Sequence, residues 1–252
     1  MAAEVINGSI PNTESDLLSM AIILYRLFML DHPFEGQNTL KCACLTEDNE
    51  RQLYGYQAVF SQDLKDSNNR PHPVYHTNSV IRWAMCPQSL KDVFCRALSK
   101  DAISNPKERV KDKEWKEMFL TLRRNLIVCT SPTGSHDFMC DNPTAISKCP
   151  CCKRKLKVNS RLAFEDGKYY YISQSKKLYL RDETKPIGEA CTCEINNNWY
   201  LGMRNISQNT WTIVTASGKL KKIAENECFP LRNGMQIQFD SQNKCIVEVR
   251  QP

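Results

Sequence analysis

No stretch of this sequence has the length and apolar character of a membrane span. The longest apolar run covers residues 17–30 and contains Arg26, whereas a bilayer crossing needs about 20 residues with few or no charges. A basic-then-apolar leader is absent ahead of this run, and no lipidation signature follows it. We therefore expect a cytoplasmic protein that has no membrane partner.

The sequence also has few glycines and only a small excess of positive charge. Its nine glycines include no Gly-x-Gly, so it lacks the glycine-rich loop that covers nucleotide phosphates. Lys and Arg number 34 against 28 Asp and Glu, and the net charge of +6 is too small and too diffuse to indicate nucleic-acid binding by itself. Nucleic acid is therefore not the partner we expect.

Cysteine, by contrast, is abundant. The chain has 13 cysteines, an odd number, and no secretory leader, which favours reduced thiols over a disulfide framework. The cysteines between positions 129 and 152 form a cluster that needs a separate explanation. Those that stand singly among apolar neighbours are predicted to be small buried hydrophobes: Cys42, Cys86, Cys95, Cys228 and Cys245.

Apolar residues follow helical spacing from the N-terminus to about position 128. Thr13 and Asp16 form a capping-box pattern that predicts the start of a helix ahead of the apolar run. Because this helix is apolar on all sides, we expect protein to surround it. Two amphipathic helices are predicted over 90–98 and 115–126.

Beyond Cys129 the spacing of apolar residues changes to two, which is typical of strands. The segment 162–172 predicts a hairpin around an Asp166-Gly167 turn, and alternation continues to the C-terminus. We therefore predict an α+β fold of several domains, with a helical part over 1–128 and a small all-β part over 159–252.

Four short motifs occur in order in the helical part: Met1-Ala-Ala-Glu-Val-Ile6, Ser15-Asp16-Leu-Leu-Ser19, His32-Pro-Phe-Glu-Gly36 and Asn105-Pro-Lys-Glu-Arg109. Together they resemble the late motifs of a protein kinase C-lobe, from the end of the activation segment to the arginine before the last helix. Leu53-Tyr-Gly55 and Ser67-Asn-Asn-Arg-Pro71 more narrowly resemble the bacterial serine/threonine kinases associated with tellurite-resistance gene clusters.

This resemblance implies a kinase C-lobe fragment over 1–128, a zinc-ribbon-like segment over 129–158 and an FHA-like β domain over 159–252. It implies a buried ion pair between Glu4 and Arg109. Asp16 has a family role as acceptor of hydrogen bonds from the catalytic loop, but without that loop we expect it to act as a helix N-terminal carboxylate. Ala3 stands where the family's Ala-Pro-Glu motif has proline.

Phosphoryl transfer needs a glycine-rich loop, a strand lysine, a catalytic Asp and Asn, and a metal-binding Asp. None of the four histidines is followed by Arg-Asp, and Asp137-Phe138-Met139 lies beyond the last lobe helix. We expect a chain that begins where an activation segment ends, with no catalytic residue of its own, and that uses Mg-ATP only within an intact parent kinase. The alternative is a non-catalytic signalling module that binds a partner kinase, phosphatase or phosphoprotein.

The spacing Cys149-Pro-Cys-Cys152 lets two thiolates reach one tetrahedral ion and predicts a structural zinc site. Cys129 is the expected third ligand, and Cys140 or His136 would complete the tetrahedron, while Cys151 should point away. The alternative is a set of spare thiols.

The segment 201–239 resembles the second half of an FHA domain. Such domains bind phosphothreonine through Arg, Ser and Asn side chains on loops, because charge-assisted hydrogen bonds to phosphate are strong. The resemblance gives Arg204, Ser207 and Asn209 as candidate phosphopeptide contacts, although the usual Ser-x-x-His pair is missing. The alternative is a β module whose polar loops are only solvated.

Overall fold

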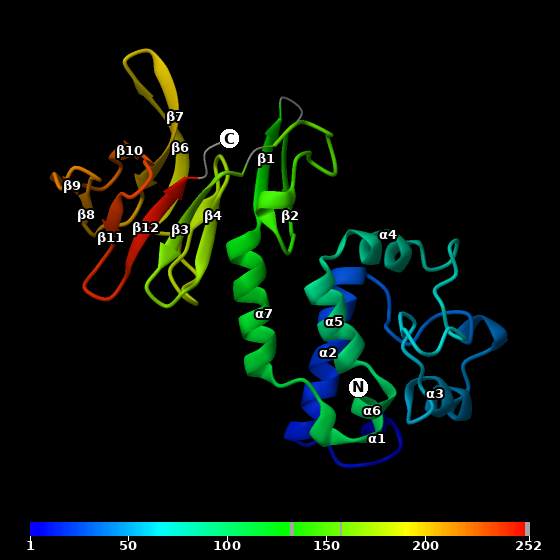
Figure 1. Cartoon of the computed structure of the whole chain (residues 1–252). Helices are drawn as coiled ribbons and strands as arrows, with labels where there is room; N and C mark the ends of the chain where they lie inside the picture. Colours follow the sequence, from blue (N-terminus) through cyan, green and yellow to red (C-terminus); the bar gives the residue numbers. More distant parts are fainter. Residues whose placement is uncertain (132–133, 157, 250–252) are drawn as a thin grey trace. The chain divides into compact units, whose positions relative to one another are not determined.

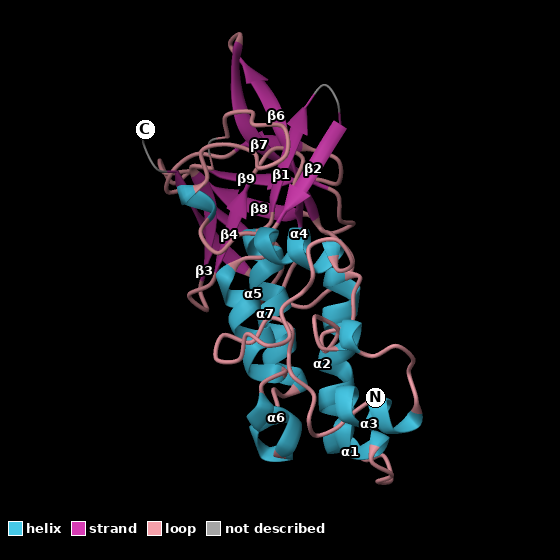
Figure 2. Ribbon diagram, turned by 90° about the vertical axis from the view of Figure 1, so that its right-hand side faces the viewer, coloured by secondary structure: helices cyan, strands magenta, loops and turns pink. Residues whose placement is uncertain are grey.

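The structure, a computed structural model, describes residues 1–131, 134–156 and 158–249. It has an α+β fold that divides into two compact units, unit 1 (Met1–Phe119) and unit 2 (Leu120–Pro252). Unit 1 is helical and unit 2 is built mainly of antiparallel sheets (Figure 2). None of the helices in the described ranges has the length and apolar character needed to cross a bilayer. The finer division at 128 and 158 stays a prediction.

The helices follow one another along the chain as labelled in Figure 1. They are α1 (Ala3–Ile6), α2 (Thr13–Met29), α3 (Glu47–Tyr54), α4 (Thr77–Met85), α5 (Gln88–Ala97), α6 (Lys100–Ser104) and α7 (Asp112–Asn125), with 3-10 turns at Thr39–Lys41, Pro106–Glu108 and Pro143–Ala145. The two predicted amphipathic helices correspond to α5 and α7.

α2 begins one residue earlier than the capping-box pattern predicted. Asn12 is the N-cap, and its Oδ1 accepts hydrogen bonds of 2.9 Å from the backbone N–H groups of Glu14 and Ser15. The Ser15 hydroxyl accepts from the Asn12 N–H in return. The prediction of Thr13 and Asp16 as the capping pair was wrong, because the Asn12 side chain satisfies the first free N–H groups of the helix.

The expectation that protein surrounds α2 was also wrong for one of its faces. Leu18, Tyr25 and Met29 are fully buried, whereas Ile23 and Leu27 are 64% and 68% exposed. These two exposed residues are four positions apart and therefore lie on one side of the helix.

Tyr25 of α2 lies at the centre of an aromatic core in unit 1. Its ring meets those of Phe60 and Phe94 edge-on, with centroids 5.4 Å apart in both pairs. Its hydroxyl lies 3.4 Å from the Ser79 hydroxyl, so the polar tip of this buried ring has a partner. This core ties α2 to α5 and to the loop that precedes α4.

A buried asparagine holds the long loops of unit 1 together. Asn69 Nδ2 donates to the carbonyl oxygens of Phe34 (2.8 Å) and Val59 (2.7 Å), and its Oδ1 accepts from the Asn38 N–H (3.0 Å). Gly36 packs directly on it, because a Cβ at that position would lie 2.0 Å from the Asn69 carbonyl oxygen. One amide side chain therefore joins the loop at residues 34–38 to the loop at Val59.

Unit 2 contains a two-stranded, a four-stranded and a six-stranded antiparallel sheet in the described part of the chain, with strand orders β1-β2, β10-β7-β6-β5 and β4-β3-β12-β11-β8-β9. The strands are β1 (Ile127–Ser131), β2 (Gly134–Phe138), β3 (Ser160–Phe164), β4 (Tyr169–Ile172), β5 (Lys177–Leu178), β6 (Gly188–Ile195), β7 (Asn198–Asn205), β8 (Trp211–Val214), β9 (Leu220–Ile223), β10 (Cys228–Pro230), β11 (Gln236–Gln238) and β12 (Lys244–Val249). The predicted hairpin around Gly167 forms between β3 and β4, and Gly167 has the positive φ (78°) that such a turn requires.

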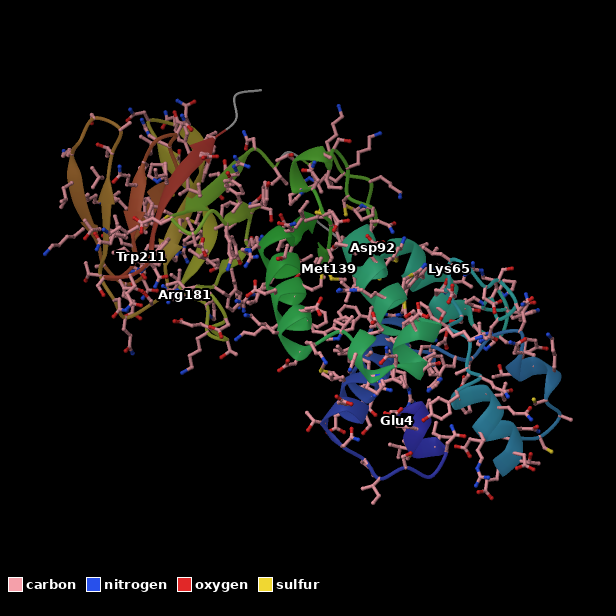
Figure 3. All side chains as sticks on the ribbon, turned by 60° about the horizontal axis from the view of Figure 1, so that its bottom comes forward. Glu4, Lys65, Asp92, Met139, Arg181 and Trp211 are labelled. Carbon is pink, nitrogen blue, oxygen red and sulfur yellow. The ribbon has the colours of Figure 1, made fainter. Side chains whose placement is uncertain are left out.

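The two larger sheets share one hydrophobic core. Trp211 on β8 is 1% exposed, and its ring meets those of Phe229 and Phe239 edge-on; Figure 3 labels Trp211 within this unit. Asn205 at the end of β7 is fully buried, and its Nδ2 donates to the carbonyl oxygens of Asn209 and Ile223.

A buried lysine joins the end of α7 to the sheets of unit 2. Lys176 is 2% exposed, and its ammonium donates to the carbonyl oxygens of Arg124 (2.6 Å) and Tyr171 (2.8 Å). Arg124 lies in the last turn of α7, where free carbonyls and the helix dipole favour a cation. Burial lowers the pKa of Lys176 to about 7, while nearby Cys140 acts in the opposite direction.

Candidate metal centre

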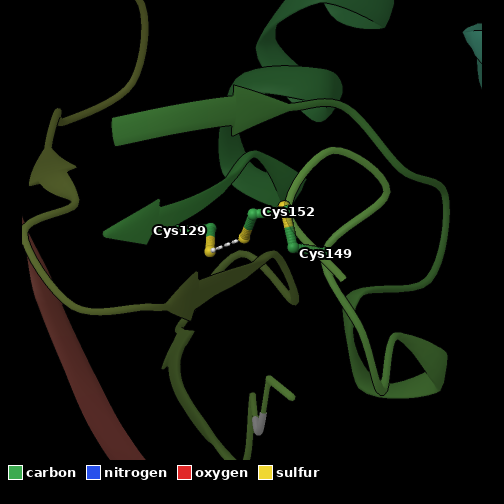
Figure 4. Close-up of side chains that lie close together, drawn as sticks. All are labelled: Cys129, Cys149 and Cys152. Carbon is green, nitrogen blue, oxygen red and sulfur yellow. Dashed lines mark hydrogen bonds between the residues drawn. The ribbon is translucent and has the colours of Figure 1, made fainter. Parts of the chain in front are cut away.

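Cys129, Cys149 and Cys152 come together in unit 2 (Figure 4). Cys129 lies on β1, and the other two lie at the ends of a tight turn. The Lys153 N–H donates to the Cys149 carbonyl (3.0 Å), and the Cys149 N–H donates to the Arg154 carbonyl (2.9 Å). These backbone bonds close the turn and place both of its thiols on the side of Cys129.

The spacing of the sulfurs matches that of a thiolate metal site. The three Sγ atoms lie within 4.8 Å of one another, and those of Cys129 and Cys152 are 3.7 Å apart. Tetrahedral ligands at a Zn–S distance of about 2.3 Å have sulfurs about 3.8 Å apart. The three residues could therefore hold a metal ion.

Cys149 and Cys129 have different pKa values because their surroundings differ. Burial opposes ionisation of Cys149, but backbone N–H groups of Cys152 and Cys151 point at its sulfur and lower its pKa to about 7. Burial and the hydrogen bonds to Cys152 and Cys149 raise the pKa of Cys129 to about 12. Cys149 therefore ionises before Cys129, and a bound cation would favour the thiolate form of both.

Neither candidate for the fourth ligand belongs to this group of sulfurs. Cys140 is buried, and its thiol donates to the Asn125 carbonyl oxygen (3.4 Å) in a small core with Ile127. His136 is half-buried and lies directly opposite Cys129 in the β1–β2 ladder, so both side chains are on the same face of the hairpin. A fourth ligand stays a prediction.

Glu4 and Arg109, the pair implied by the kinase resemblance, lie together in unit 1. The guanidinium donates to both carboxylate oxygens, at 2.6 and 2.9 Å. It also donates to the carbonyls of Ala102 (3.0 Å) and Glu14 (2.7 Å). The side chain of Arg109 is 2% exposed and that of Glu4 is 12% exposed, so this is a buried, bidentate ion pair. Asp16 lies exposed in the first turn of α2.

Two of the three phosphopeptide candidates lie on one loop and the third on a strand. Arg204 is exposed on β7, and Asn209 is exposed in the loop before β8. The Ser207 hydroxyl donates to Asn205 Oδ1 (2.7 Å) and accepts from Trp211 Nε1 (3.1 Å). These bonds give Ser207 a structural role in closing its loop.

A second group of cysteines was missed by the sequence interpretation. Cys191, Cys193 and Cys228 have sulfurs within 4.8 Å of one another. The signal for two of them was present, because residues i and i+2 of a strand share a face. Cys228 was interpreted as an isolated buried hydrophobe, and this was wrong: it is half-buried beside two other thiols.

Comparisons with protein-family models, with curated proteins and with solved structures gave no match for this chain.

Proposed function

We propose that this chain is the C-terminal part of a serine/threonine protein kinase and that it docks against a separate nucleotide-binding part. The observation that carries this proposal is the Glu4–Arg109 ion pair. A bidentate pair that joins the first helix to the loop before the last helix of the lobe is the feature that the resemblance to kinase C-lobes requires.

The exposed face of α2 supports a protein partner. Ile23 and Leu27 are each more than half exposed and, four positions apart, lie on one face of the helix. Leu30, the C-cap residue that follows the helix, is also more than half exposed. Burying each of these side chains in a partner would contribute about 1.5–3 kcal/mol. The partner that we propose is the part of the kinase that carries the nucleotide site.

Zinc is the metal that we propose for Cys129, Cys149 and Cys152. Buried thiolates select zinc over magnesium or calcium, which prefer oxygen ligands. The hydrophobic core beside the turn is small, so a bound ion would supply much of the stability of this segment. The site is structural in this proposal and takes no part in phosphoryl transfer.

The test of the kinase proposal compares the chain alone with the chain plus its partner. Alone, the purified chain should show no Mg-ATP binding by calorimetry and no transfer of radiolabelled phosphate. A candidate partner is a polypeptide with His-Arg-Asp and Asp-Phe-Gly motifs encoded next to this chain, and adding it should restore transfer. Ile23→Asp should abolish the restored transfer, whereas Ile10→Asp, at a residue 85% exposed outside α2, should not. Micromolar ATP binding with turnover by the chain alone would overturn the proposal.

The exposed Arg204 favours a second candidate function, the binding of a phosphoprotein by the FHA-like part. The side chain of Arg204 is exposed, and a guanidinium can form a charge-assisted bond with a phosphate. Fluorescence titration with phosphothreonine peptides tests this function directly. Binding that needs the phosphate and is lost in Arg204→Gln supports it, and equal binding of unphosphorylated peptides excludes it.

A further inference from the structure

Three strands of unit 2 bring a second set of thiols to one face of a sheet. Cys191 and Cys193 lie on β6, Cys228 lies on β10, and β7 runs between these strands. In the ladders, Gly202 of β7 is opposite Cys191, and Arg204 of β7 is opposite Cys228. Because paired residues and residues two apart share a face, all three cysteines lie on the same side of the sheet.

Gly202 allows these thiols to meet across the strand that separates them. A Cβ at position 202 would lie 2.2 Å from the Cys193 sulfur and 2.7 Å from the Phe229 carbonyl oxygen. Any side chain at this position would therefore push the Cys193 thiol away. The absence of a side chain on β7 creates the space that the sulfur occupies, next to the edge strand that carries Cys228.

The sulfur spacing fits one thiophilic ion. The Sγ atoms of Cys191 and Cys193 are 3.9 Å apart, and all three sulfurs lie within 4.8 Å of one another. For bonds of about 2.3 Å, sulfurs around one ion are about 3.8 Å apart in a tetrahedral site and about 4.0 Å apart in a trigonal one. The observed distance falls between these two values.

The charges around the cluster suit a bound cation. Three thiolates and a divalent ion leave one negative charge, and the guanidinium of Arg204 is on the same face of the sheet. Burial and the hydrogen bond to Cys228 raise the pKa of Cys193 to about 11, and Arg204 acts in the opposite direction. A metal ion would have to displace the proton of this thiol.

We propose that Cys191, Cys193 and Cys228 form a metal centre in which three thiolates hold one thiophilic cation, Zn²⁺ or Cu⁺. On binding, each S–H bond breaks, its proton passes to solvent, and a sulfur–metal bond forms in its place, with no change of oxidation state. The cysteines are half-buried, so solvent can supply a fourth ligand to Zn²⁺, whereas Cu⁺ is satisfied by three thiolates.

The centre is independent of the site at Cys129, Cys149 and Cys152 and of the kinase proposal. It can therefore be tested in the full chain that carries Cys152→Ser, where the first site is disabled. The reduced, metal-free chain is titrated with Zn²⁺ in the presence of a chromophoric competitor and, in a separate arm without oxygen, with Cu⁺. Co²⁺ serves as a spectroscopic probe, because thiolate coordination gives it a charge-transfer absorption.

We expect one equivalent of Zn²⁺ or Cu⁺ in the Cys152→Ser background and none when Cys193→Ser or Cys228→Ser is added. Cys44→Ser, at an exposed cysteine outside both groups, is the matched control and should keep the ion. Gly202→Ala keeps every thiol but displaces the Cys193 sulfur, and we expect it to weaken binding by about 10–100-fold, as changes that misplace metal ligands do.

Circular dichroism establishes that each variant is folded. Ligand variants are made on two different strands, so that the test still holds if one of them does not fold. The proposal is overturned if folded Cys152→Ser binds neither ion, or if Cys193→Ser and Cys228→Ser both leave its binding unchanged. Formation of a Cys191–Cys193 disulfide under air, with no metal bound under reducing conditions, would also overturn it.

Discussion

The carboxylate of Glu4 meets the guanidinium of Arg109 across 105 positions of sequence, in two hydrogen bonds of 2.6 and 2.9 Å. Arg109 also satisfies backbone carbonyls on two other segments. The charge on Arg109 therefore neutralises the Glu4 carboxylate, while its other hydrogen bonds fix the backbone around it.

Replacing Arg109 by alanine leaves Glu4 buried without its counter-ion. We expect Arg109→Ala to lower the free energy of unfolding by about 3–5 kcal/mol, measured by urea denaturation. The control is Arg51→Ala, which breaks an exposed pair with Glu47 at i, i+4 and should cost about 0.3–0.5 kcal/mol. Equal effects of the two substitutions would contradict the energetic role of the buried pair.

The same pair predicts how stability changes in acid. Burial raises the pKa of Glu4, but the hydrogen bonds from Arg109 and from its own backbone lower it by more, so the folded-state pKa lies below 4.5. A lowered carboxyl pKa stabilises the folded state above the unfolded pKa, and this contribution is lost as the pH falls through the folded value. The stability difference between the wild type and Glu4→Gln should therefore shrink between about pH 6 and about pH 3. A constant difference over that range would show that the pair does not titrate as described.

Loss of the first metal site should loosen the β1–β2 hairpin and the cysteine turn before either larger sheet unfolds. We expect Cys152→Ser to lose about one equivalent of zinc and to increase hydrogen exchange at Val128 and Lys153, because the adjacent core is small. Cys151→Ser is the control, since Cys151 is exposed and outside the cluster. Zinc content that falls equally in both variants would argue against the ligand assignment.

The buried ammonium of Lys176 predicts that the free energy of unfolding changes with pH between about 7 and 10.5. Its pKa falls from 10.5 in the unfolded chain to about 7 in the folded protein, chiefly through burial. Between these values the unfolded chain binds more protons, so the contribution of Lys176 to stability rises with pH over this interval. Lys176→Met should remove this rise. Guanidinium unfolding curves at several pH values measure the slope, and an unchanged slope in the variant would assign it to other groups.

Local signals in the sequence predicted more of the structure than long-range ones did. The turn at Gly167 depends on one backbone angle, and the spacing of Cys149 and Cys152 depends on one turn, so both could be predicted from a few adjacent residues. The meeting of Cys228 with Cys191 depends on the order of strands in a sheet and on a glycine in a third strand. No pattern within a short window contains that information.

The residues that cover each face of α2 could not be predicted from the sequence of the helix. Its composition is apolar on all sides, but composition does not say which neighbours are present to cover each side. Tyr25 is buried because aromatic rings from three other segments meet it, whereas Leu27, two positions further along the same helix, is 68% exposed. The pattern predicted the helix correctly and its surroundings only in part.

The side chain of Asn69 makes the loops of unit 1 depend on a single amide group. Its nitrogen holds the carbonyls of Phe34 and Val59, and hydrolysis of this amide would replace that donor with an oxygen of nearly the same size. Shape would be preserved, but two carbonyls would then face a carboxylate in a buried position, which is costly. Replacement of the amide nitrogen by oxygen would remove the two hydrogen bonds that hold these loops together. The aromatic core around Tyr25 does not use this amide and would keep its packing.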